Sequence, residues 1–412
     1  MTTVTSTRTP PDSPGSRYRR LFARPGVTAL VLYGLVARLP SGMNVLAVML
    51  VVTASGRSYA LAGAASAACA VGAGVSGPLR GRLVDRRGAT RVLVTAAVAQ
   101  GAAMAALLVT AVAGLPAPVL LGATFAVGAL LPPVAPIMRT LWDRLLEDDE
   151  EAKSAAFAWE TVILDLVYIL GPGLLAALAG TLPPEACLGL SALCTVTGCL
   201  GLATRPAVRS LTPSPSGPLH WAGALRVPAV RRRLPVAFLA TGSLAAVEVA
   251  ALRFADGHGT AADTGWLLAV LSVGSATGGL LYGAVRLPGA VSVQLAAALV
   301  LLTASWTAAA LLTGQLALYA VFAAGGVLLG PTMTMQFTEV ARAAPRSVTT
   351  ESFAWLNSLG QAGSSAAAAG AGVLVAGGTA APGFALAAAM TALAAVLAFG
   401  VRPRQGAAVP TS

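Results

Sequence analysis

The sequence predicts an all-α, polytopic membrane protein with twelve transmembrane helices. Of its 412 residues, 56% are hydrophobic and only 10% are charged, whereas soluble domains usually carry about 25% charged residues. Apolar segments of the roughly 20 residues that cross a bilayer recur along the whole chain. Alternating strands of about ten residues, the pattern of a membrane barrel, are absent, so the spans are predicted to be helices, which bond their own backbone groups.

Short polar segments separate the apolar ones and set the limits of the predicted spans. The spans are residues 27–53, 59–79, 92–113, 117–138, 155–179, 186–204, 234–255, 264–285, 290–313, 316–337, 353–376 and 383–401. The longest polar interruption, 205–233, is predicted to be a cytoplasmic linker between an N-terminal six-helix bundle, 26–204, and a C-terminal one, 234–401. Residues 1–25 and 402–412 are predicted to be cytoplasmic tails, the first of them disordered because it is polar, rich in proline and unlike a signal peptide.

The basic residues predict that both termini lie in the cytoplasm, because Lys and Arg concentrate in cytoplasmic loops. With the N-terminus inside, 24 of the 27 Lys and Arg fall in cytoplasmic segments, all except Arg38, Arg57 and Arg253. The net charge of +11 is then a topology signal. No basic patch on a soluble domain indicates nucleic-acid binding.

Other polar features carry no catalytic pattern. The four cysteines lie in apolar spans, where cysteine usually packs as a small residue, and the two histidines are far apart in sequence. We therefore expect no metal site, no cofactor and no enzyme activity. The acidic run EDDEE at 147–151 is predicted to be a solvated cap on a short amphipathic helix.

Internal similarity indicates that the two halves are repeats, with Phe-Ala-Trp triplets at equivalent places. The similar pairs are residues 154–166 with 350–362, 128–136 with 326–334, and 77–92 with 278–293. Parallel repeats with a binding site between them near the membrane midplane are a transporter architecture.

The turn after the second span carries a motif, GRLVDRRGATR. Its characteristic residues are Gly81, Leu83, Asp85, Arg86 and Gly88. With the twelve spans in two repeats, this motif makes nearly the whole chain resemble the major facilitator superfamily. Ala89 and Thr90 replace the basic pair of the family motif, and Arg91 follows one place on.

The resemblance implies two six-helix bundles that rock about a central cavity. It also implies that Gly81, Asp85, Arg86, Gly88 and Arg91 form a conformational latch between the halves in the outward-facing state. Asp85 can accept hydrogen bonds from a neighbouring helix N-terminus, Gly81 lets helices approach closely, and Gly88 permits a tight reversal. The alternative is a basic turn that only follows the topology rule.

The fifth span contains LGPGLLAAL, with Gly171, Pro172 and Gly173. It resembles a motif of drug and proton antiporters in this superfamily and favours export over import. Pro172 would kink the helix, and the glycines would admit a partner helix. A generic kink without directional meaning is the alternative, and Thr124 stands where drug exporters often carry an arginine.

Charged residues inside the spans are the candidate coupling groups, since each costs about 2.5–3.5 kcal/mol at a helix centre. They are Arg38, Glu160, Asp165 and Glu248. Arg38 and Asp165 lie about 17 Å and 15 Å from the cytoplasmic ends of their spans. The resemblance implies that the first and fifth helices are neighbours that border the central cavity. We therefore predict that Arg38 and Asp165 pair in this polar cavity, or alternatively that they only fix helix packing. Glu160 is expected to pair with Arg139 or Lys153 and to be structural.

Glu248 is the first candidate for the proton site and Asp165 the second, because a carboxylic acid at low dielectric can exchange a proton near neutral pH. A static bond from Glu248 to Arg253 or a hydroxyl is the alternative. The predicted substrate-cavity residues are Tyr33, Asn44, Trp159, Gln336, Trp355, Asn357 and Gln361. Each alone is more often a packing residue.

Together these features predict a monomeric, multi-pass transporter of the bacterial inner membrane. It would use the proton gradient to export a small, partly apolar organic compound such as a drug, a sugar or a secondary metabolite. Its partners would be this compound, protons and the lipid bilayer. Proton-linked uptake of a sugar or metabolite, and a non-transporting receptor of the same fold, are the alternatives.

Overall fold

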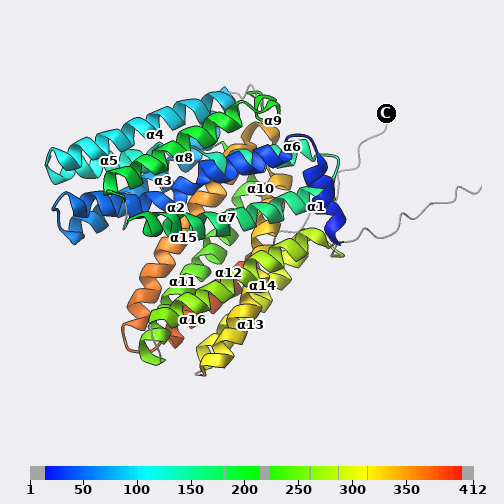
Figure 1. Ribbon diagram of the computed structural model, residues 1–412. Helices are drawn as coiled ribbons and strands as arrows, with labels where there is room; N and C mark the ends of the chain where they lie inside the picture. The colour runs from blue at the N-terminus through cyan, green and yellow to red at the C-terminus, as the bar shows by residue number, and fades with distance from the viewer. Residues whose placement is uncertain are drawn as a thin grey trace, which may run out of the picture.

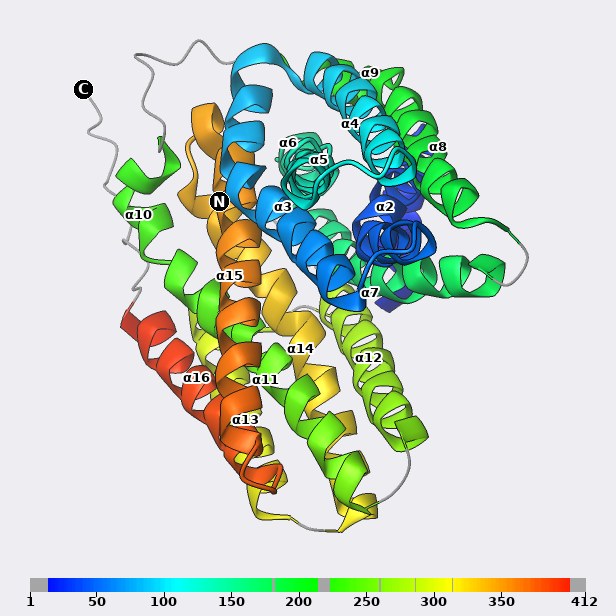
Figure 2. The ribbon, with the colours of Figure 1, turned by 90° about the vertical axis from the view of Figure 1, so that its left-hand side faces the viewer.

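The computed structural model describes residues 14–179, 182–213, 223–258, 261–285, 287–312 and 314–400. Within these ranges the chain is helical, and the helices form two groups. Figure 1 shows the groups close together at the end that carries α1 and α6 and diverging toward the opposite end. Figure 2, seen from that opposite end, shows α3 beside α15 and α7 beside α12 where the groups meet. We call the end where they meet the linker end, because it carries the described parts of 205–233.

The first group contains α2 to α8. Its helices are α2 (Val27–Ala54), α3 (Tyr59–Arg87), α4 (Ala89–Val112), α5 (Ala117–Ala129), α6 (Val134–Leu145), α7 (Glu150–Ala179) and α8 (Pro184–Ala203). The predicted fourth span is broken into α5 and α6 at Pro132 and Pro133, because proline has no N–H for the helical hydrogen bond.

The second group contains α11 to α16. Its helices are α11 (Leu234–His258), α12 (Ala261–Ala284), α13 (Val291–Leu311), α14 (Gln315–Ala343), α15 (Thr349–Val375) and α16 (Ala381–Gly400). Short helices at the linker end are α9 (Pro206–Arg209), η1 (Ala224–Arg226), α10 (Pro228–Arg231) and η2 (Arg346–Val348).

The predicted all-α fold with twelve membrane helices is confirmed. Eleven helical segments of the described chain are long and apolar enough to cross a membrane, and α15 occupies the place of the eleventh predicted span. Several helices, such as α3 and α14, run past their predicted limits toward the linker end. Polar residues there lowered the local hydropathy without breaking the helix.

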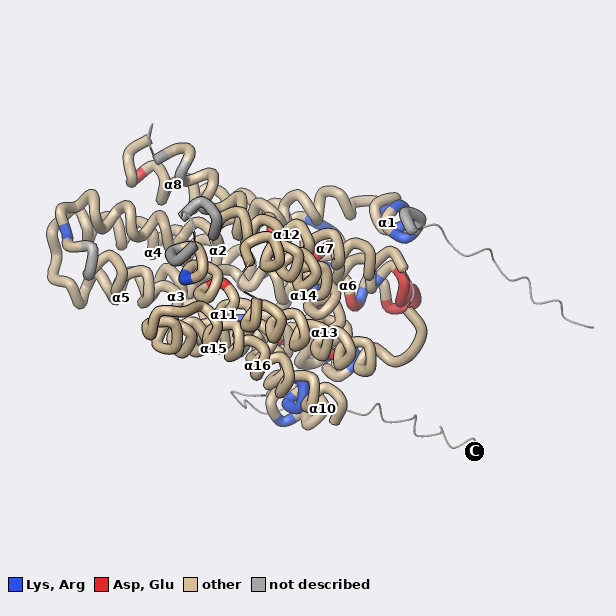
Figure 3. The backbone as a smooth tube through the Cα atoms, turned by 90° about the horizontal axis from the view of Figure 1, so that it is seen from below, with Lys and Arg blue, Asp and Glu red and all other residues tan. Residues whose placement is uncertain are grey.

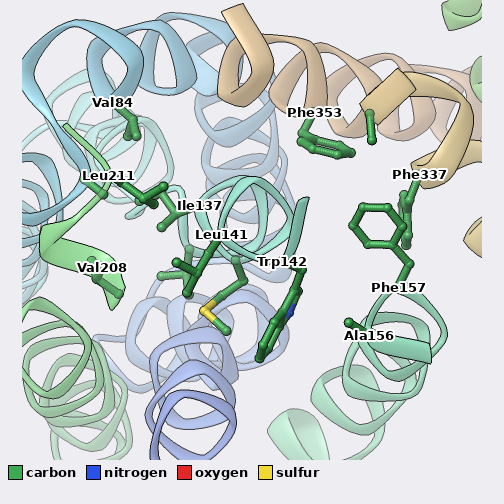
Figure 4. Packing of buried hydrophobic residues seen from close by; sticks show 14 of the residues in the cluster. Val84, Ile137, Leu141, Trp142, Ala156, Phe157, Val208, Leu211, Phe337 and Phe353 are labelled. Carbon is green, nitrogen blue, oxygen red and sulfur yellow. The ribbon is translucent and has the colours of Figure 1, made fainter. Parts of the chain in front are cut away.

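The two groups have separate apolar cores and share a third at the linker end. One core contains only residues of the first group and another only residues of the second. The shared core places Phe157 of α7 against Phe337 of α14 and Phe353 of α15, with ring centroids 6.2 and 6.1 Å apart. Figure 4 shows this aromatic cluster beside Trp142 of α6. The groups are therefore packed together at the linker end.

The predicted disorder of residues 1–25 is wrong for α1 (Pro14–Ala23). Tyr18 donates a hydrogen bond of 2.9 Å to the carbonyl oxygen of Leu280 in α12, and Leu21 is buried in the shared core. Arg17 pairs with Glu151 at 3.3 Å. The helix thus contacts both groups, because its apolar and basic side chains each find a partner. The predicted tail 402–412 lies outside the described residues.

Close packing of α3 on α5 depends on a glycine. A side chain at Gly128 would overlap the carbonyl oxygen of Cys69, whereas one at Gly122 of the same helix would meet open space. We expect Gly128→Ala to lower the free energy of unfolding by about 1–3 kcal/mol. Gly122→Ala should leave it unchanged or raise it by about 0.5–1 kcal/mol. Thermal unfolding in detergent measures both, and equal effects of the two variants would contradict this packing.

Candidate functional site: a charged cavity between the two groups

A cavity of about 480 Å³ lies between the two groups of helices. The first group contributes only α6 and α7 to its wall, and the second contributes α11, α12, α14 and α15. The lining residues are Arg139, Thr161, Leu164, Asp165, Tyr168, Ile169, Ala237, Thr241, Leu244, Ala245, Glu248, Leu268, Leu271, Ser272, Ser275, Leu329, Met333, Gln336, Phe337, Leu356, Asn357, Gly360, Gln361 and Ser364. The wall is mostly apolar, with a few polar groups, as in small-molecule sites.

Asp165 of α7 and Glu248 of α11 both line this cavity, from opposite groups. Asp165 lies beside Ser275 of α12. Arg253, the predicted alternative partner of Glu248, instead donates to the carbonyl oxygen of Gly378 at 3.1 Å. The two predicted proton sites therefore face one shared space.

The predicted pair of Arg38 and Asp165 is wrong. Arg38 Nη2 lies 2.8 Å from Glu160 Oε2, and the two side chains are only 7% and 2% exposed. Trp142 Nε1 donates to the other oxygen of Glu160 at 2.9 Å. Positions 160 and 165 point about 140° apart around a helix, so equal depth did not place Asp165 on the face toward α2. Glu160 is a buried partner, as predicted, but of Arg38 and not of Arg139 or Lys153.

Three of the seven predicted substrate residues line the cavity: Gln336, Asn357 and Gln361. The amide of Gln361 donates to the hydroxyl of Tyr168 across the two groups at 3.3 Å.

The other four lie elsewhere. Asn44 is buried and accepts a bond of 2.7 Å from Ser191, and the ring of Trp159 meets Phe22 of α1 edge-on. Arg205 covers the ring of Tyr33, and Trp355 packs against the shared core. Depth in a span is readable from the sequence, whereas these four side chains are turned away from the cavity by the rotation of their helices.

The predicted latch residues bring α3 onto α15. The carboxylate of Asp85 accepts hydrogen bonds from the backbone N–H groups of Thr350 at 3.2 Å and Glu351 at 2.8 Å. These are free donors in the first turn of α15, and the helix dipole adds to the attraction. A Cβ on Gly81 would lie 2.6 Å from Ala354 Cβ, so only glycine permits this approach. Gly88 ends α3 with φ of +82°.

The remaining latch and kink residues are Arg86, Arg91 and residues 171–173. Arg91 is exposed, and Arg86 is partly exposed on the last turn of α3. Helix α7 continues through residues 171–173. A Cβ on Gly171 would lie 3.1 Å from the backbone of Gly42 in α2, whereas one on Gly173 would meet nothing within 4 Å. The side chain of Pro172 lies outside the described residues.

The acidic run at 147–151 is largely exposed, as the sequence predicted, but it also joins the two groups. Figure 3 shows acidic and basic residues gathered at the linker end. Glu147 pairs with Arg346 and Glu150 with Arg342 at 2.9 Å, both across the two groups. The bond and charge of Arg346 lower the pKa of the Glu147 carboxyl below its ordinary value. Because that carboxyl stays ionised down to its lowered pKa, this exposed contact is retained at neutral pH and lost on acidification.

Sequence reasoning missed Arg139 as a cavity residue. It follows directly after the predicted fourth span, where a basic residue reads as a topology signal. In the structure it is 2% exposed and lines the cavity. Its guanidinium lies over the ring of Phe337, 3.9 Å from the ring centroid.

A family model described as Major Facilitator Superfamily matches residues 30–253, more than half of the chain. The chain belongs to this superfamily. Among curated proteins, an uncharacterised MFS-type transporter, y4rN, from Sinorhizobium fredii is 30% identical over 187 residues. That match spans 45% of each chain, so less than half of the length of this relative is matched.

Solved structures share the fold at low identity. The human organic anion transporter MFSD10 is 18% identical, with 95% of this chain and 100% of that chain covered and a TM-score of 0.70. A bacterial homologue of the iron transporter ferroportin in an outward-facing state is 16% identical, with 91% and 98% covered and a TM-score of 0.72. FucP in the outward conformation is 16% identical, with 93% and 100% covered and a TM-score of 0.70.

Membership of this superfamily, with the apolar helices of the described residues, shows a multi-pass membrane protein. The prediction that it is not an enzyme is confirmed by its family. Its cavity is accordingly a candidate site for a transported small molecule.

The corrected pairing of Arg38 predicts which carboxylate stabilises the fold. Glu160→Gln leaves the buried guanidinium of Arg38 without a counter-ion, which should lower the free energy of unfolding by about 3–5 kcal/mol. Asp165→Asn should have little effect, because no described cation pairs with that carboxylate. Adding Arg38→Gln to Glu160→Gln should recover most of the loss. Thermal unfolding of the three variants tests this, and a larger loss in Asp165→Asn would support the original pairing.

Proposed function

We propose that this protein exports a small, partly apolar organic compound in exchange for protons, by rocking of the two helix groups about the cavity. The observation that carries the proposal is the placement of Asp165 and Glu248 on opposite walls of one mostly apolar space. Ionisable residues inside transporter spans commonly mark ion and substrate pathways. The apolar walls, formed by leucine, alanine and isoleucine side chains, suit a partly apolar compound.

Exchange follows from competition for the same carboxylates. A proton on Asp165 or Glu248 removes the negative charge that would hold a basic or hydrogen-bonding group of the compound. Loading of protons on one side and of the compound on the other then couples their movements in opposite directions. The glycines and proline at 171–173, similar to the motif of exporters, support this direction.

The proposed orientation places both termini and the linker end in the cytoplasm, as the basic residues predict. Contacts between the groups are then concentrated on the cytoplasmic side of the cavity, and the structure corresponds to an outward-facing state. Asp85 on the first turn of α15 and the pairs of Glu147 and Glu150 would hold that state. Resemblance to two structures described as outward supports this assignment.

Replacement of the cavity carboxylates tests the coupling. Full-length protein in proteoliposomes is given a panel of candidate compounds under a pH gradient imposed in each direction, and flux and its sign are measured. Glu248→Gln and Asp165→Asn should reduce gradient-driven flux toward that of empty liposomes. Exchange of labelled for unlabelled compound without a gradient should persist in each single variant, because the remaining carboxylate still holds the compound and exchange needs no proton release.

Glu185→Gln is the matched control, since Glu185 is an exposed carboxylate in the first turn of α8, outside the cavity. It should transport like the unmodified protein. Gradient-driven flux that survives both cavity substitutions would assign Asp165 and Glu248 a structural role. Flux of the compound in the same direction as the protons would indicate proton-linked uptake. No flux at any pH gradient would favour a non-transporting receptor.

A further inference from the structure

Two guanidinium groups, those of Arg38 and Arg139, lie near one buried carboxylate, and Arg139 lines the cavity. The charged groups that act most strongly on Arg139 are Glu160 and Arg38. Glu160 is already paired with Arg38 at 2.8 Å, and no described carboxylate forms an ion pair with Arg139. These three groups therefore carry one excess positive charge, in a place where a buried, uncompensated charge is costly.

The guanidinium of Arg139 is positioned by an aromatic ring and has an unused hydrogen-bond donor. Its Cζ atom lies over the ring of Phe337, 3.9 Å from the centroid, a cation–π contact that helps to position the group. The N–H bonds of a guanidinium lie in its plane and match the oxygens of a carboxylate or phosphate. Arg139 Nε is buried and has no hydrogen-bond partner, although the residue lines the cavity.

A neighbouring side-chain amide also lacks a strong hydrogen-bond partner. Gln336 lines the cavity next to Phe337 and is 4% exposed. Its Nε2 makes only a long contact of 4.0 Å with the sulfur of Met333. A buried amide normally finds stronger partners. The cavity wall thus presents several N–H donors and one unmatched cation, the pattern that recognises an anion.

We propose that Arg139 is the docking point for an anionic group, a carboxylate or phosphate, of the transported compound. The inference rests on the proposed function and narrows its substrate class. Asp165 and Glu248 lie on the walls of the same cavity and are suited to a basic group. The compound is therefore amphoteric, with its anionic end on Arg139 and its basic end toward the two carboxylates.

Matched probes test the subsite without knowledge of the natural substrate. Purified full-length protein is titrated with 4-(aminomethyl)benzoate and with the larger phenylalanyl-phenylalanine, each beside its methyl ester, and binding is followed by calorimetry and by the shift in thermal unfolding. The ester keeps the amine and the apolar body but removes the anion. At least one free acid should bind about tenfold or more tightly than its ester, as expected for a charge-assisted bond.

The arginine variants decide whether this preference belongs to the subsite. Arg139→Gln should abolish the preference for the free acid, and Arg139→Lys, which keeps the charge without the planar fork, should retain part of it. Arg253→Gln is the control, because Arg253 bonds Gly378 outside the cavity, and it should retain all of it. If Arg139→Gln does not fold, the preference of Arg139→Lys for the free acid is compared with that of the unmodified protein.

Two results would overturn the inference. In the first, the Arg139 variants prefer the free acid over its ester as strongly as the unmodified protein does. In the second, neither free acid binds more tightly than its ester. Proton-driven flux of another compound could still be found in that case. Conversely, free-acid binding that depends on Arg139, without flux under any pH gradient, would contradict the proposed transport and leave the subsite standing.

Discussion

The arrangement of this protein depends on carboxylates of the first helix group that are held by donors of the second at the linker end. Asp85 receives two N–H groups at the start of α15, and Glu147 and Glu150 receive Arg346 and Arg342. A helix N-terminus is a fixed donor that requires no side-chain ordering, so the Asp85 contact loses little entropy on closing. The cavity exists because the groups are joined here and diverge beyond.

The seal beneath the cavity combines these polar contacts with an aromatic layer. Phe157 of the first group packs against Phe337 and Phe353 of the second, and buries apolar area without directional bonds. Apolar contacts of this kind can be separated and rejoined without leaving unpaired polar groups. Phe337 also carries the guanidinium of Arg139, so the seal and the charged wall of the cavity share one ring.

The sequence predicted the number of membrane helices and their approximate limits, because apolar length is a local property. It also predicted that Asp165 and Glu248 line the cavity, because a charged residue within a span is visible in the sequence. It did not predict that Arg38 reaches Glu160, since five residues separate Glu160 from Asp165 and turn them to different faces. The sequence also did not identify Arg139 as a cavity residue. A basic residue at the end of a span resembles a topology signal until its rotamer and its neighbour Phe337 are known. The bridging role of 147–151 needed the position of Arg342 and Arg346, more than 190 residues away.

The ion pair of Arg38 within the first group differs in strength from the ion pairs of Glu147 and Glu150 between the groups. Arg38, Glu160 and Trp142 all belong to the first group, and this buried network would remain intact while the groups rock as proposed. Breaking a buried pair costs about 3–5 kcal/mol. The pairs of Glu147 and Glu150 with the second group are exposed, and exposed ion pairs contribute little to stability. The strong ion pair therefore stabilises the first group, whereas weak ion pairs and the Asp85 contact join it to the second, an arrangement that suits the proposed rocking.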